Sequence, residues 1–441
     1  MDLDKALRDL IPENMIKRSE TTLESLLGPI RNVLHQRRFP DAGFTDLQLE
    51  MFFKVLSSLD TDKDLEAARV GEREGRIASP YVGNLAAGFN HGIGRSGHVT
   101  APQPKAPGAS LMYQVANQVA LDAFRKLGLG NVAAGLILPV STGMSIGLSF
   151  AALRRLEKIS GVLYPRIDHE SPRRGIELVG LDLIETPTCL NMDTVEADVG
   201  ALESALSSKK RYAVLATTTF FPPRASDPIK EIAKLCQEYG KPLVINNAYG
   251  VQSEKIMKSI YSAIDAGRVD AIIQSGDKNF LAPVGSSIIV SPNAELIDAV
   301  SETYAGRASA APVLQTFAAL LSLGRIRYEE LRKEQVHCRS ILQESIEEIA
   351  SKTNQRVLDV ENQIAVGMTI DDIDANSLGG RLYNRRVTGP RAIKAGSYGS
   401  CIEDYPHDYI VMNAAIGTSK KDIEKATTKL YKEITSHTKS A

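Results

Sequence analysis

The chain has 441 residues, of which 43% are hydrophobic and 24% charged, and its formal net charge is −1. This composition excludes wholesale disorder, and the near-zero charge excludes a uniformly basic protein that coats nucleic acid, although it allows a local basic patch. No apolar run approaches the roughly 18 residues typical of a membrane span. The polar amino terminus does not resemble a signal peptide, and the four cysteines are scattered without a CxxC pair. We therefore expect a reduced, cytoplasmic protein without a disulfide framework or a metal centre.

The first 60 residues predict amphipathic helices. Apolar residues recur at intervals of three and four from Leu23 to Phe39 and again from Thr45 to Leu59. Pro29 interrupts the first stretch, which predicts a kink or a new helix start there. Thr45 is a candidate cap for the second helix.

Residues 71–108 form a long segment rich in glycine and proline, and such loops in compact proteins are usually functional or disordered. Residues 92–97 match GxGxxG, but neither a preceding strand nor a following helix is predicted, so a dinucleotide site is rejected. Several side chains of the segment suit an anionic group: Arg73, Arg76, Arg95, Ser96, Gln103 and Lys105. A solvated loop is the alternative.

Residues 109–310 alternate between helical patterns and short apolar runs, which predicts an α/β fold with a mostly parallel sheet covered on both faces. Ligands of such sheets bind at the carboxyl ends of the strands. From residue 311 the pattern indicates helices, a few strands and a docked terminal helix over residues 419–436. The predicted parts are 1–108, a helical extension with the loop; 109–310, a large domain; and 311–441, a small domain.

Two polar segments follow strands of the predicted sheet. Lys278 follows an apolar run in VDAIIQSGDKNF. A solvated lysine is the commoner explanation, and the functional hypothesis is a Schiff-base lysine that holds pyridoxal phosphate. Asn247 follows the run in PLVINNAYG, where pyridoxal enzymes usually place an Asp against the pyridine nitrogen. A simple turn explains Asn247 equally well when it is considered alone.

Two further segments extend this pattern. Residues 141–145, STGMS, lie between a strand and a helix, which suits either a bound phosphate or a plain helix cap. His169 follows another apolar run, and such a residue either stacks on a cofactor ring or has a structural role. The order of phosphate loop, stacking residue, Asn and Lys favours a pyridoxal phosphate site more than any one member does.

The chain from Gly380 onward carries 11 Lys and Arg against 6 Asp and Glu. Several of these basic side chains surround Tyr383. A solvated face is the usual explanation for such a run, and contact with a nucleic-acid backbone is the alternative.

Together, several strings resemble the O-phosphoseryl-tRNA:selenocysteinyl-tRNA synthase family. In chain order between residues 71 and 324 they are GEREGR, HGIGRSG with QPKAPGAS, STGMS, YPRID, NNAYGVQS, QSGDKNF with APVG, and YAGRASAAP with LLSLG. The loop GIGRSG…QPK is distinctive for this family, whereas the lysine context alone indicates only a pyridoxal enzyme. The short ends are similar to those of archaeal rather than animal members, and His98 stands where many members have an acidic residue.

The resemblance implies a pyridoxal-phosphate-dependent transferase of the aspartate-aminotransferase-like fold type I. Its members convert O-phosphoseryl-tRNA(Sec) to selenocysteinyl-tRNA(Sec) with selenophosphate, by eliminating phosphate and adding selenium. They assemble as homotetramers with sites between subunits. The amino-terminal helices and the carboxyl-terminal region hold the tRNA.

Roles for individual residues also follow from the resemblance. Lys278 matches the lysine that carries pyridoxal 5′-phosphate and then acts as the base at the substrate Cα. The other cofactor-binding positions are Asn247 by the pyridine nitrogen, His169 on the ring, Thr142, Gly143 and Met144 around the phosphate, and Arg73 across a subunit interface. The positions that bind the phosphate of phosphoserine are Arg95, Ser96, Gln103 and Arg307, and Arg391 matches the neighbourhood that reads the tRNA acceptor end.

Four alternatives are weaker. Decarboxylases and cysteine desulfurases usually have His before the lysine, where this chain has Asp277. Desulfurases, and the related enzymes that form cysteinyl-tRNA from phosphoseryl-tRNA, also need working cysteines. A tRNA-binding scaffold without catalysis would not need Lys278 or the loop donors.

Overall fold

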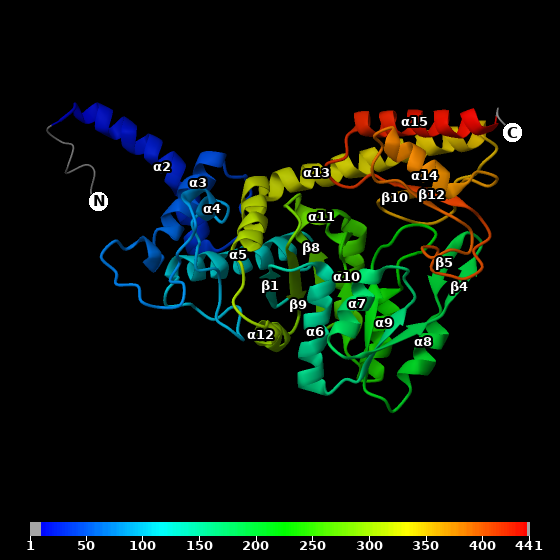
Figure 1. The fold of residues 1–441 in the computed structure, drawn as a ribbon, viewed down its shortest axis with the longest axis horizontal. Helices are drawn as coiled ribbons and strands as arrows, with labels where there is room; N and C mark the ends of the chain where they lie inside the picture. The colour runs from blue at the N-terminus through cyan, green and yellow to red at the C-terminus, as the bar shows by residue number, and fades with distance from the viewer. Residues whose placement is uncertain (1–9, 439–441) are drawn as a thin grey trace.

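A seven-stranded sheet lies at the centre of the protein in the computed structural model, which describes residues 10–438 (Figure 1). The strand order is β1-β9-β8-β7-β6-β2-β3. The strands are β1 (Ala134–Leu138), β2 (Gly161–Pro165), β3 (Asp182–Thr186), β6 (Tyr212–Thr217), β7 (Leu243–Asn246), β8 (Ala271–Ser275) and β9 (Ser287–Ser291). Pairing is parallel from β8 through β3, and β9 runs antiparallel to both β8 and β1. The predicted mostly parallel sheet is confirmed.

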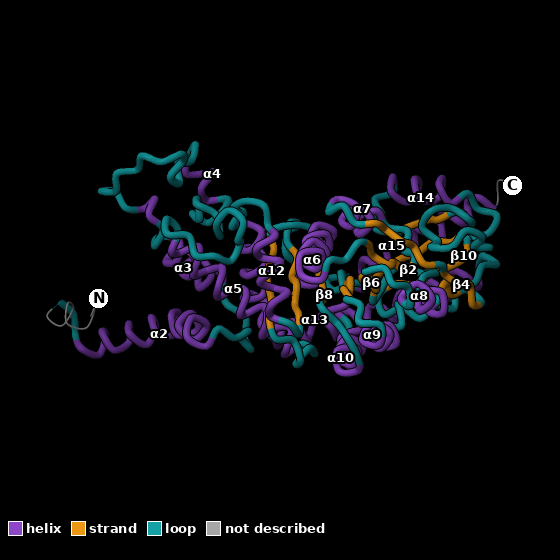
Figure 2. Tube along the Cα trace, turned by 90° about the horizontal axis from the view of Figure 1, so that it is seen from below, coloured by secondary structure: helices purple, strands orange, loops and turns teal. Residues whose placement is uncertain are grey.

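The central strands are buried on both faces, which explains their continuous apolar runs. Helices connect them: α5 (Pro107–Lys126), α6 (Thr142–Glu157), α7 (Glu170–Leu178), α8 (Val199–Leu206), α9 (Ile229–Glu238), α10 (Glu254–Ala266) and α12 (Ala294–Thr303). Figure 2 shows α6 and α7 on one side of the strands and α9 and α10 on the other. The carboxyl ends of the parallel strands therefore share one edge of a covered sheet, where ligands of such sheets bind.

A long helix, α13 (Ala311–Lys352), joins this sheet to a second apolar core at the carboxyl-terminal end (Figure 1). Gly324 interrupts its helical backbone with a φ of 60°. The second core contains a three-stranded antiparallel sheet and two helices: β10 (Ala365–Thr369), β11 (Arg391–Ile393), β12 (Tyr409–Asn413), α14 (Ala375–Asn384) and α15 (Lys420–Thr438). Helix α15 confirms the predicted terminal helix, and it buries Ile423, Leu430 and Ile434. The domain boundaries at residues 108 and 310 stay predictions.

The amino-terminal helices α2 (Glu13–Gln36) and α3 (Asp46–Ser57) pack beside α5. Thr45 caps α3 as expected, because its hydroxyl accepts a hydrogen bond from the backbone of Gln48 at 3.3 Å. Helix α2 continues through Pro29, so the expectation of a new helix start there is wrong. Proline has no N–H to donate to the carbonyl of Ser25. The side-chain amide of Gln48 donates to that carbonyl instead, at 3.3 Å.

The segment between α3 and α5 contains two short helices, η1 (Thr61–Lys63) and α4 (Pro80–Asn84), and is otherwise irregular. The remaining elements are the hairpin β4 (Thr188–Asn191) and β5 (Thr194–Ala197), the 3₁₀ turn η2 (Gly250–Gln252), and the short helix α11 (Gly276–Phe280). Among the helices within residues 10–438, none combines the length and the apolar character needed to cross a bilayer.

Candidate active site

Lys278 lies just beyond the carboxyl end of β8, in the short helix α11. Asn279 fixes this helix, because its side-chain amide donates to the carbonyls of Ala248 and Ser275 at 2.8 and 2.9 Å. The Lys278 ammonium lies 5.1 Å from the ring centroid of Tyr249, within the range of a cation–π contact. The lysine is half-buried, so its Nζ is available to a molecule at this sheet edge.

Asn247 follows β7, the strand next to β8, and its side chain is fully buried. Its backbone N–H donates to the carbonyl of Ile273 at 2.8 Å. The hydroxyl of Thr218 donates to Asn247 Oδ1 at 2.7 Å, and Asn247 Nδ2 lies 3.8 Å from the sulfur of Met257. These contacts fix the orientation of a neutral carboxamide at the same sheet edge as Lys278.

Residues Thr142, Gly143 and Met144 form the first turn of α6, as the strand-to-helix pattern predicted. Ser141 caps the helix through a long contact, 3.5 Å, from the Met144 N–H to its hydroxyl. The Thr142 hydroxyl oxygen is buried and has no hydrogen-bond partner among the described residues. Gly143 has a packing role, because a Cβ there would lie 2.2 Å from the Ser171 hydroxyl. The open amides and the unpartnered hydroxyl suit a phosphate at this helix end.

His169 begins α7 and lies edge-on to Phe220, with the ring centroids 6.1 Å apart. Burial lowers the pKa of His169, and the positive charges of Lys278 and Arg391 lower it further. Arg391 lies 4.5 Å from the ring centroid of Phe221. Arg391, which the family resemblance matches to the neighbourhood that reads the tRNA acceptor end, therefore lies close enough to His169 to lower its pKa, as Lys278 does.

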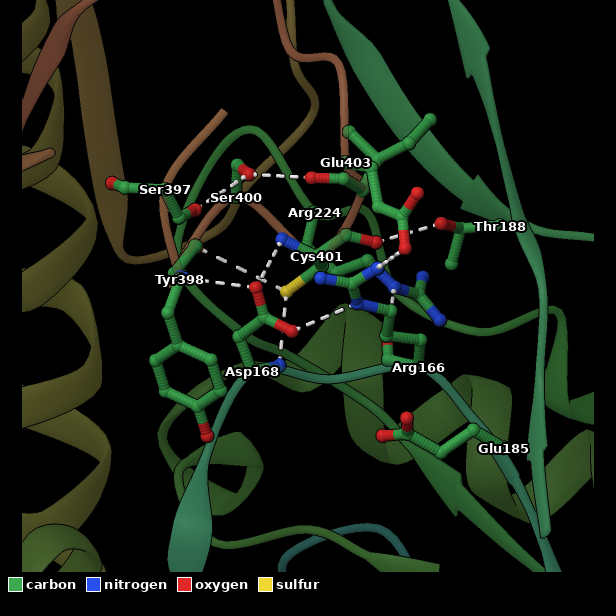
Figure 3. A network of polar contacts seen from close by, with 12 residues as sticks. Arg166, Asp168, Glu185, Thr188, Arg224, Ser397, Tyr398, Ser400, Cys401 and Glu403 are labelled. Atoms are coloured by element: carbon green, nitrogen blue, oxygen red, sulfur yellow. Dashed lines mark hydrogen bonds and ion pairs between the residues drawn. The ribbon is translucent and has the colours of Figure 1, made fainter. Parts of the chain in front are cut away.

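A buried polar network holds the carboxyl-terminal segment against the end of β2 (Figure 3). Asp168 is 3% exposed, and its Oδ2 accepts hydrogen bonds from the backbone N–H groups of Gly399 and Cys401 at 2.8 and 2.9 Å. Its Oδ1 accepts from Arg166 Nε at 3.0 Å. Because Asp168 immediately precedes His169, this network also fixes the start of α7.

The glycine-rich loop within residues 71–108 forms a separate polar pocket of about 390 Å³. The polar lining of this arginine pocket comprises Arg73, His91, Arg95, Ser96, Gln103, Lys105 and Arg307, together with the carboxylates of Glu72 and Glu74. Lys105 pairs with Glu74, which lowers the pKa of that carboxyl. No ion pair among the described residues involves the three arginines. Their combined charge suits a dianion.

Close backbone contacts shape this loop. Gly92, Gly94 and Gly97 all have φ near +70°, and a Cβ at Gly94 would lie 2.1 Å from the carbonyl of Val99. Ile93 pairs with Ala308 through backbone hydrogen bonds of 2.9 and 3.2 Å. That pairing brings Arg307 beside the loop, although the two are more than 200 residues apart in the chain. The rejection of a dinucleotide site is consistent with the structure, since neither a strand nor a helix flanks the glycines.

The structure thus gathers the predicted residues into two groups. Lys278, Asn247, His169, Thr142 and Arg391 lie about the sheet edge. The loop residues with Arg73 and Arg307 line the other pocket. No hydrogen bond or ion pair within residues 10–438 joins the two groups, and the lining of the loop pocket includes none of the sheet-edge residues.

The sequence reasoning missed several side chains of the site. Thr218 and Phe220 follow β6, and Tyr249 follows β7, so all three lie just past carboxyl ends of parallel strands. The rule that ligands bind at these ends would have indicated them. His91 and Asp62 beside the arginine pocket carried no comparable signal.

The first group fits a phosphorylated aromatic aldehyde such as pyridoxal phosphate. Lys278 offers an amine, the start of α6 offers amides and a buried unpartnered hydroxyl, and His169 offers a ring. Asn247 offers a neutral partner for a ring nitrogen. Arg73, the remaining predicted cofactor contact, belongs to the second group within one chain.

Comparison with known proteins agrees with this geometry. Residues 59–435 match the family model of O-phosphoseryl-tRNA(Sec) selenium transferase. The O-phosphoseryl-tRNA(Sec) selenium transferase of Methanopyrus kandleri is 44% identical over 97% of this chain and 99% of its own. That of Methanococcus maripaludis is 43% identical over 98% of this chain and 99% of its own. A crystal structure of an archaeal O-phosphoseryl-tRNA(Sec) selenium transferase superposes with a TM-score of 0.93 at 43% identity, covering 96% of this chain and 98% of that one.

More distant structures share the fold alone. A tryptophan decarboxylase from Catharanthus roseus has a TM-score of 0.59 at 13% identity, covering 97% of this chain and 99% of that one. A sphingosine-1-phosphate lyase from Burkholderia pseudomallei has a TM-score of 0.55 at 17% identity, covering 86% of this chain and 95% of that one. The predicted fold class, the fold type I of pyridoxal phosphate enzymes, is confirmed. Over nearly its whole length, the chain belongs to the O-phosphoseryl-tRNA(Sec) selenium transferase family.

Proposed function

We propose that this protein converts O-phosphoseryl-tRNA(Sec) to selenocysteinyl-tRNA(Sec), with selenophosphate as the selenium donor and pyridoxal 5′-phosphate as the cofactor. The observation that carries the proposal is that one chain contains both a lysine suited to the cofactor and a pocket suited to the phosphate of the substrate. A strand-end lysine lies at the sheet edge. Three arginines that form no ion pair within residues 10–438 line a pocket large enough for a phosphate group. The near-complete match to the relatives supports the same activity.

The cofactor, when bound, makes the Cα–H bond of the attached amino acid acidic by accepting its electrons. Lys278 Nζ is the amine closest to this chemistry, and we assign it the removal of the Cα proton. Tyr249 covers one side of the lysine, and Asn279 holds the helix that carries it. Thr142 and the amides of α6 would hold the cofactor phosphate, and His169 would contact its ring.

The second pocket binds the phosphate group that leaves the substrate. Arg95, Gln103 and Arg307 donate hydrogen bonds to its oxygens and stabilise the charge that develops as the Cβ–O bond breaks. Because the arginines have no carboxylate partner within the described chain, their charge is not neutralised before the phosphate arrives. The selenium of selenophosphate then adds to Cβ of the dehydroalanyl group on the tRNA, and a proton returns to Cα. Water cleaves the Se–P bond, which releases a second phosphate and leaves the selenol.

The two pockets act on one substrate, so we propose that each complete site combines Lys278 of one chain with Arg95 and Arg307 of a second copy, within a homotetramer. Exposed apolar side chains around the loop support this assembly. Leu65 and Val70 are each 95% exposed, and Tyr81 is 74% exposed. Arg73, in the same pocket, would then reach the cofactor of the neighbouring chain.

We place the tRNA acceptor end near Arg391, whose guanidinium lies over Phe221 beside the Lys278 group. The amino-terminal helix α2 projects away from the body in both views and offers a further tRNA surface (Figures 1 and 2). The four free cysteines agree with a cytoplasmic location.

Sulfur transfer is the less suitable alternative. A desulfurase needs a reactive thiolate. Cys401 belongs to the buried network around Asp168, the residue before His169. Burial raises the pKa of Cys401 to about 12, so it stays a protonated thiol. Cys236 is buried as well, and its pKa is raised to about 12.

The test uses the full chain loaded with pyridoxal phosphate. Borohydride treatment followed by peptide mapping should place the reduced cofactor on Lys278. The same preparation, given phosphoseryl-tRNA(Sec) and selenophosphate, should release phosphate and form selenocysteinyl-tRNA(Sec), whereas Lys278→Ala should bind the tRNA without releasing phosphate. An intact phosphoseryl-tRNA(Sec) after incubation with the loaded wild-type protein would contradict the proposal.

A further inference from the structure

His91 is a buried histidine that lines the arginine pocket. Its side chain is 2% exposed, and it shares the pocket wall with Arg95, Gln103 and Arg307. The imidazole forms no hydrogen bond with any residue that the structure describes, and its Nε2 is fully buried. A buried polar ring without a partner is costly unless something else pairs with it.

The carboxylate of Asp62 lies beside the His91 ring. Its Oδ2 already accepts hydrogen bonds from Lys63 Nζ at 2.7 Å and from Asn90 Nδ2 at 2.8 Å. Its Oδ1 is buried without a hydrogen-bond partner and lies 3.8 Å from His91 Nε2. That distance is too long for a hydrogen bond but within the range of an ion pair. The geometry of the pair therefore suits a protonated His91. The surroundings of the ring favour the neutral form instead.

Burial and the charges around His91 favour the neutral ring. Burial lowers the pKa of His91 most strongly, and the positive charges of Arg73 and Arg307 lower it further. Asp62 and Glu74 act in the opposite direction without overcoming these effects. The ring is therefore neutral at pH 7. A dianion in the pocket would offset both arginines and favour the imidazolium, which would then have an anion on one side and Asp62 on the other.

We propose that His91 is a contact residue for the phosphate in this pocket, and that it takes up one proton from solution when a tetrahedral dianion binds, with Asp62 as its counter-ion. The proposal rests on the proposed function in one respect, namely that the anion is the phosphate of phosphoserine. Seryl-tRNA brings no dianion and leaves His91 neutral. His91 therefore contributes to the preference for the phosphorylated substrate.

Sulfate is the probe, because it is a dianion that does not titrate near pH 7. Any proton taken up when sulfate binds is therefore taken up by the protein and not by the ligand. Calorimetric titration of the pyridoxal-phosphate-loaded full chain at pH 7, in two buffers with different ionisation enthalpies, gives the protons taken up per sulfate. The wild-type protein should take up close to one. Its affinity should tighten up to tenfold for each pH unit between 8 and 7, because proton and anion binding are reciprocally coupled.

Variants locate the proton. His91→Asn should bind sulfate about tenfold more weakly at pH 7, with no proton uptake and less than a twofold change per pH unit. His98→Asn, in the same loop but outside the pocket lining, should behave as wild type. Asp60 is the other group near the pair that titrates close to this range, since burial raises its pKa to about 6. Asp60→Asn should keep the proton uptake, and Arg307→Ala should lose sulfate binding altogether.

Two outcomes would overturn the assignment of His91: sulfate binding by the wild-type protein without proton uptake, or unchanged uptake in His91→Asn. The first needs no variant, so a folding defect in His91→Asn would not leave the question open. Failure to turn over phosphoseryl-tRNA(Sec), with proton uptake intact, would instead overturn the proposed function and leave the role of His91 standing.

Discussion

Asp168 and Cys401 hold each other through two reciprocal hydrogen bonds, although they are 233 residues apart in the chain. The Cys401 N–H donates to Asp168 Oδ2 at 2.9 Å, and the Asp168 N–H donates to Cys401 Sγ at 3.2 Å. This contact joins the segment before β12 to the residue that precedes His169 (Figure 3).

Asp168→Asn should therefore destabilise the protein by about 3 kcal/mol, because an amide replaces a buried acceptor of three donors and removes the nearer of the two charge partners of Arg166. Urea denaturation followed by circular dichroism measures the change. Asp182→Asn, an exposed carboxylate on β3, should change stability by less than about 0.5 kcal/mol. Equal stabilities of Asp168→Asn and wild type would show that the network is not a stabilising link.

Arg307→Ala should slow phosphate elimination from phosphoseryl-tRNA(Sec) by roughly 10²–10³-fold, because it removes a donor at the developing charge on phosphate. Single-turnover phosphate release is the measurement. Lys230→Ala, which removes an exposed charge on α9, is the matched control and should leave the rate unchanged. A rate for Arg307→Ala within threefold of wild type would remove Arg307 from the reaction.

Sharing of the site between chains can be tested by complementation. Lys278→Ala should be inactive, and Arg307→Ala should keep at most about a hundredth of the wild-type rate. Unfolding and refolding the two variants together in equal amounts should restore activity at about a quarter of the sites, where both intact halves meet. Light scattering on the wild-type protein should give a mass four times that of the 47.9 kDa chain. A monomer, or a mixture without recovered activity, would refute the shared site.

Asp60 gives a pH dependence of stability with a defined sign. Burial raises its folded pKa to about 6, from an ordinary value of 3.8, so the folded state binds the proton before the unfolded state does. As the pH falls from 7.5 to 4.5, wild type should gain up to about 2 kcal/mol of unfolding free energy relative to Asp60→Asn. Urea denaturation of both proteins across this range tests it. A constant difference would mean that Asp60 is not perturbed.

Asn247→Asp places a carboxylate in a fully buried position whose described contacts include no cation. The cofactor-free variant should melt at a lower temperature than wild type. Added pyridoxal phosphate should raise the melting temperature of the variant more than that of wild type, since a protonated ring nitrogen would pair with the new charge. Equal shifts in the two proteins would argue against Asn247 as the partner of that nitrogen. We also expect faster phosphate elimination by the variant, because the charged partner strengthens electron withdrawal by the cofactor.

The sequence by itself determined the sheet and the Lys278 group. Buried parallel strands need continuous apolar runs, and parallel strands bring their carboxyl ends to one edge, so polar residues directly after β2, β7 and β8 had to lie near one another. The motif strings also determined the family, because their order and spacing are retained along residues 71–324.

Only the tertiary structure decided how distant segments meet. The pairing of Ile93 with Ala308 brings Arg307 to the loop, Gln48 compensates for the missing N–H of Pro29, and Asp62 faces His91. None of these contacts has a periodic or local signal in the sequence, because each depends on a backbone path through segments without regular structure or on a single side chain that crosses between elements. The separation of the two pockets within one chain has the same origin. Local patterns identify which residues lie at a strand end, whereas packing alone decides which strand end or loop lies opposite another.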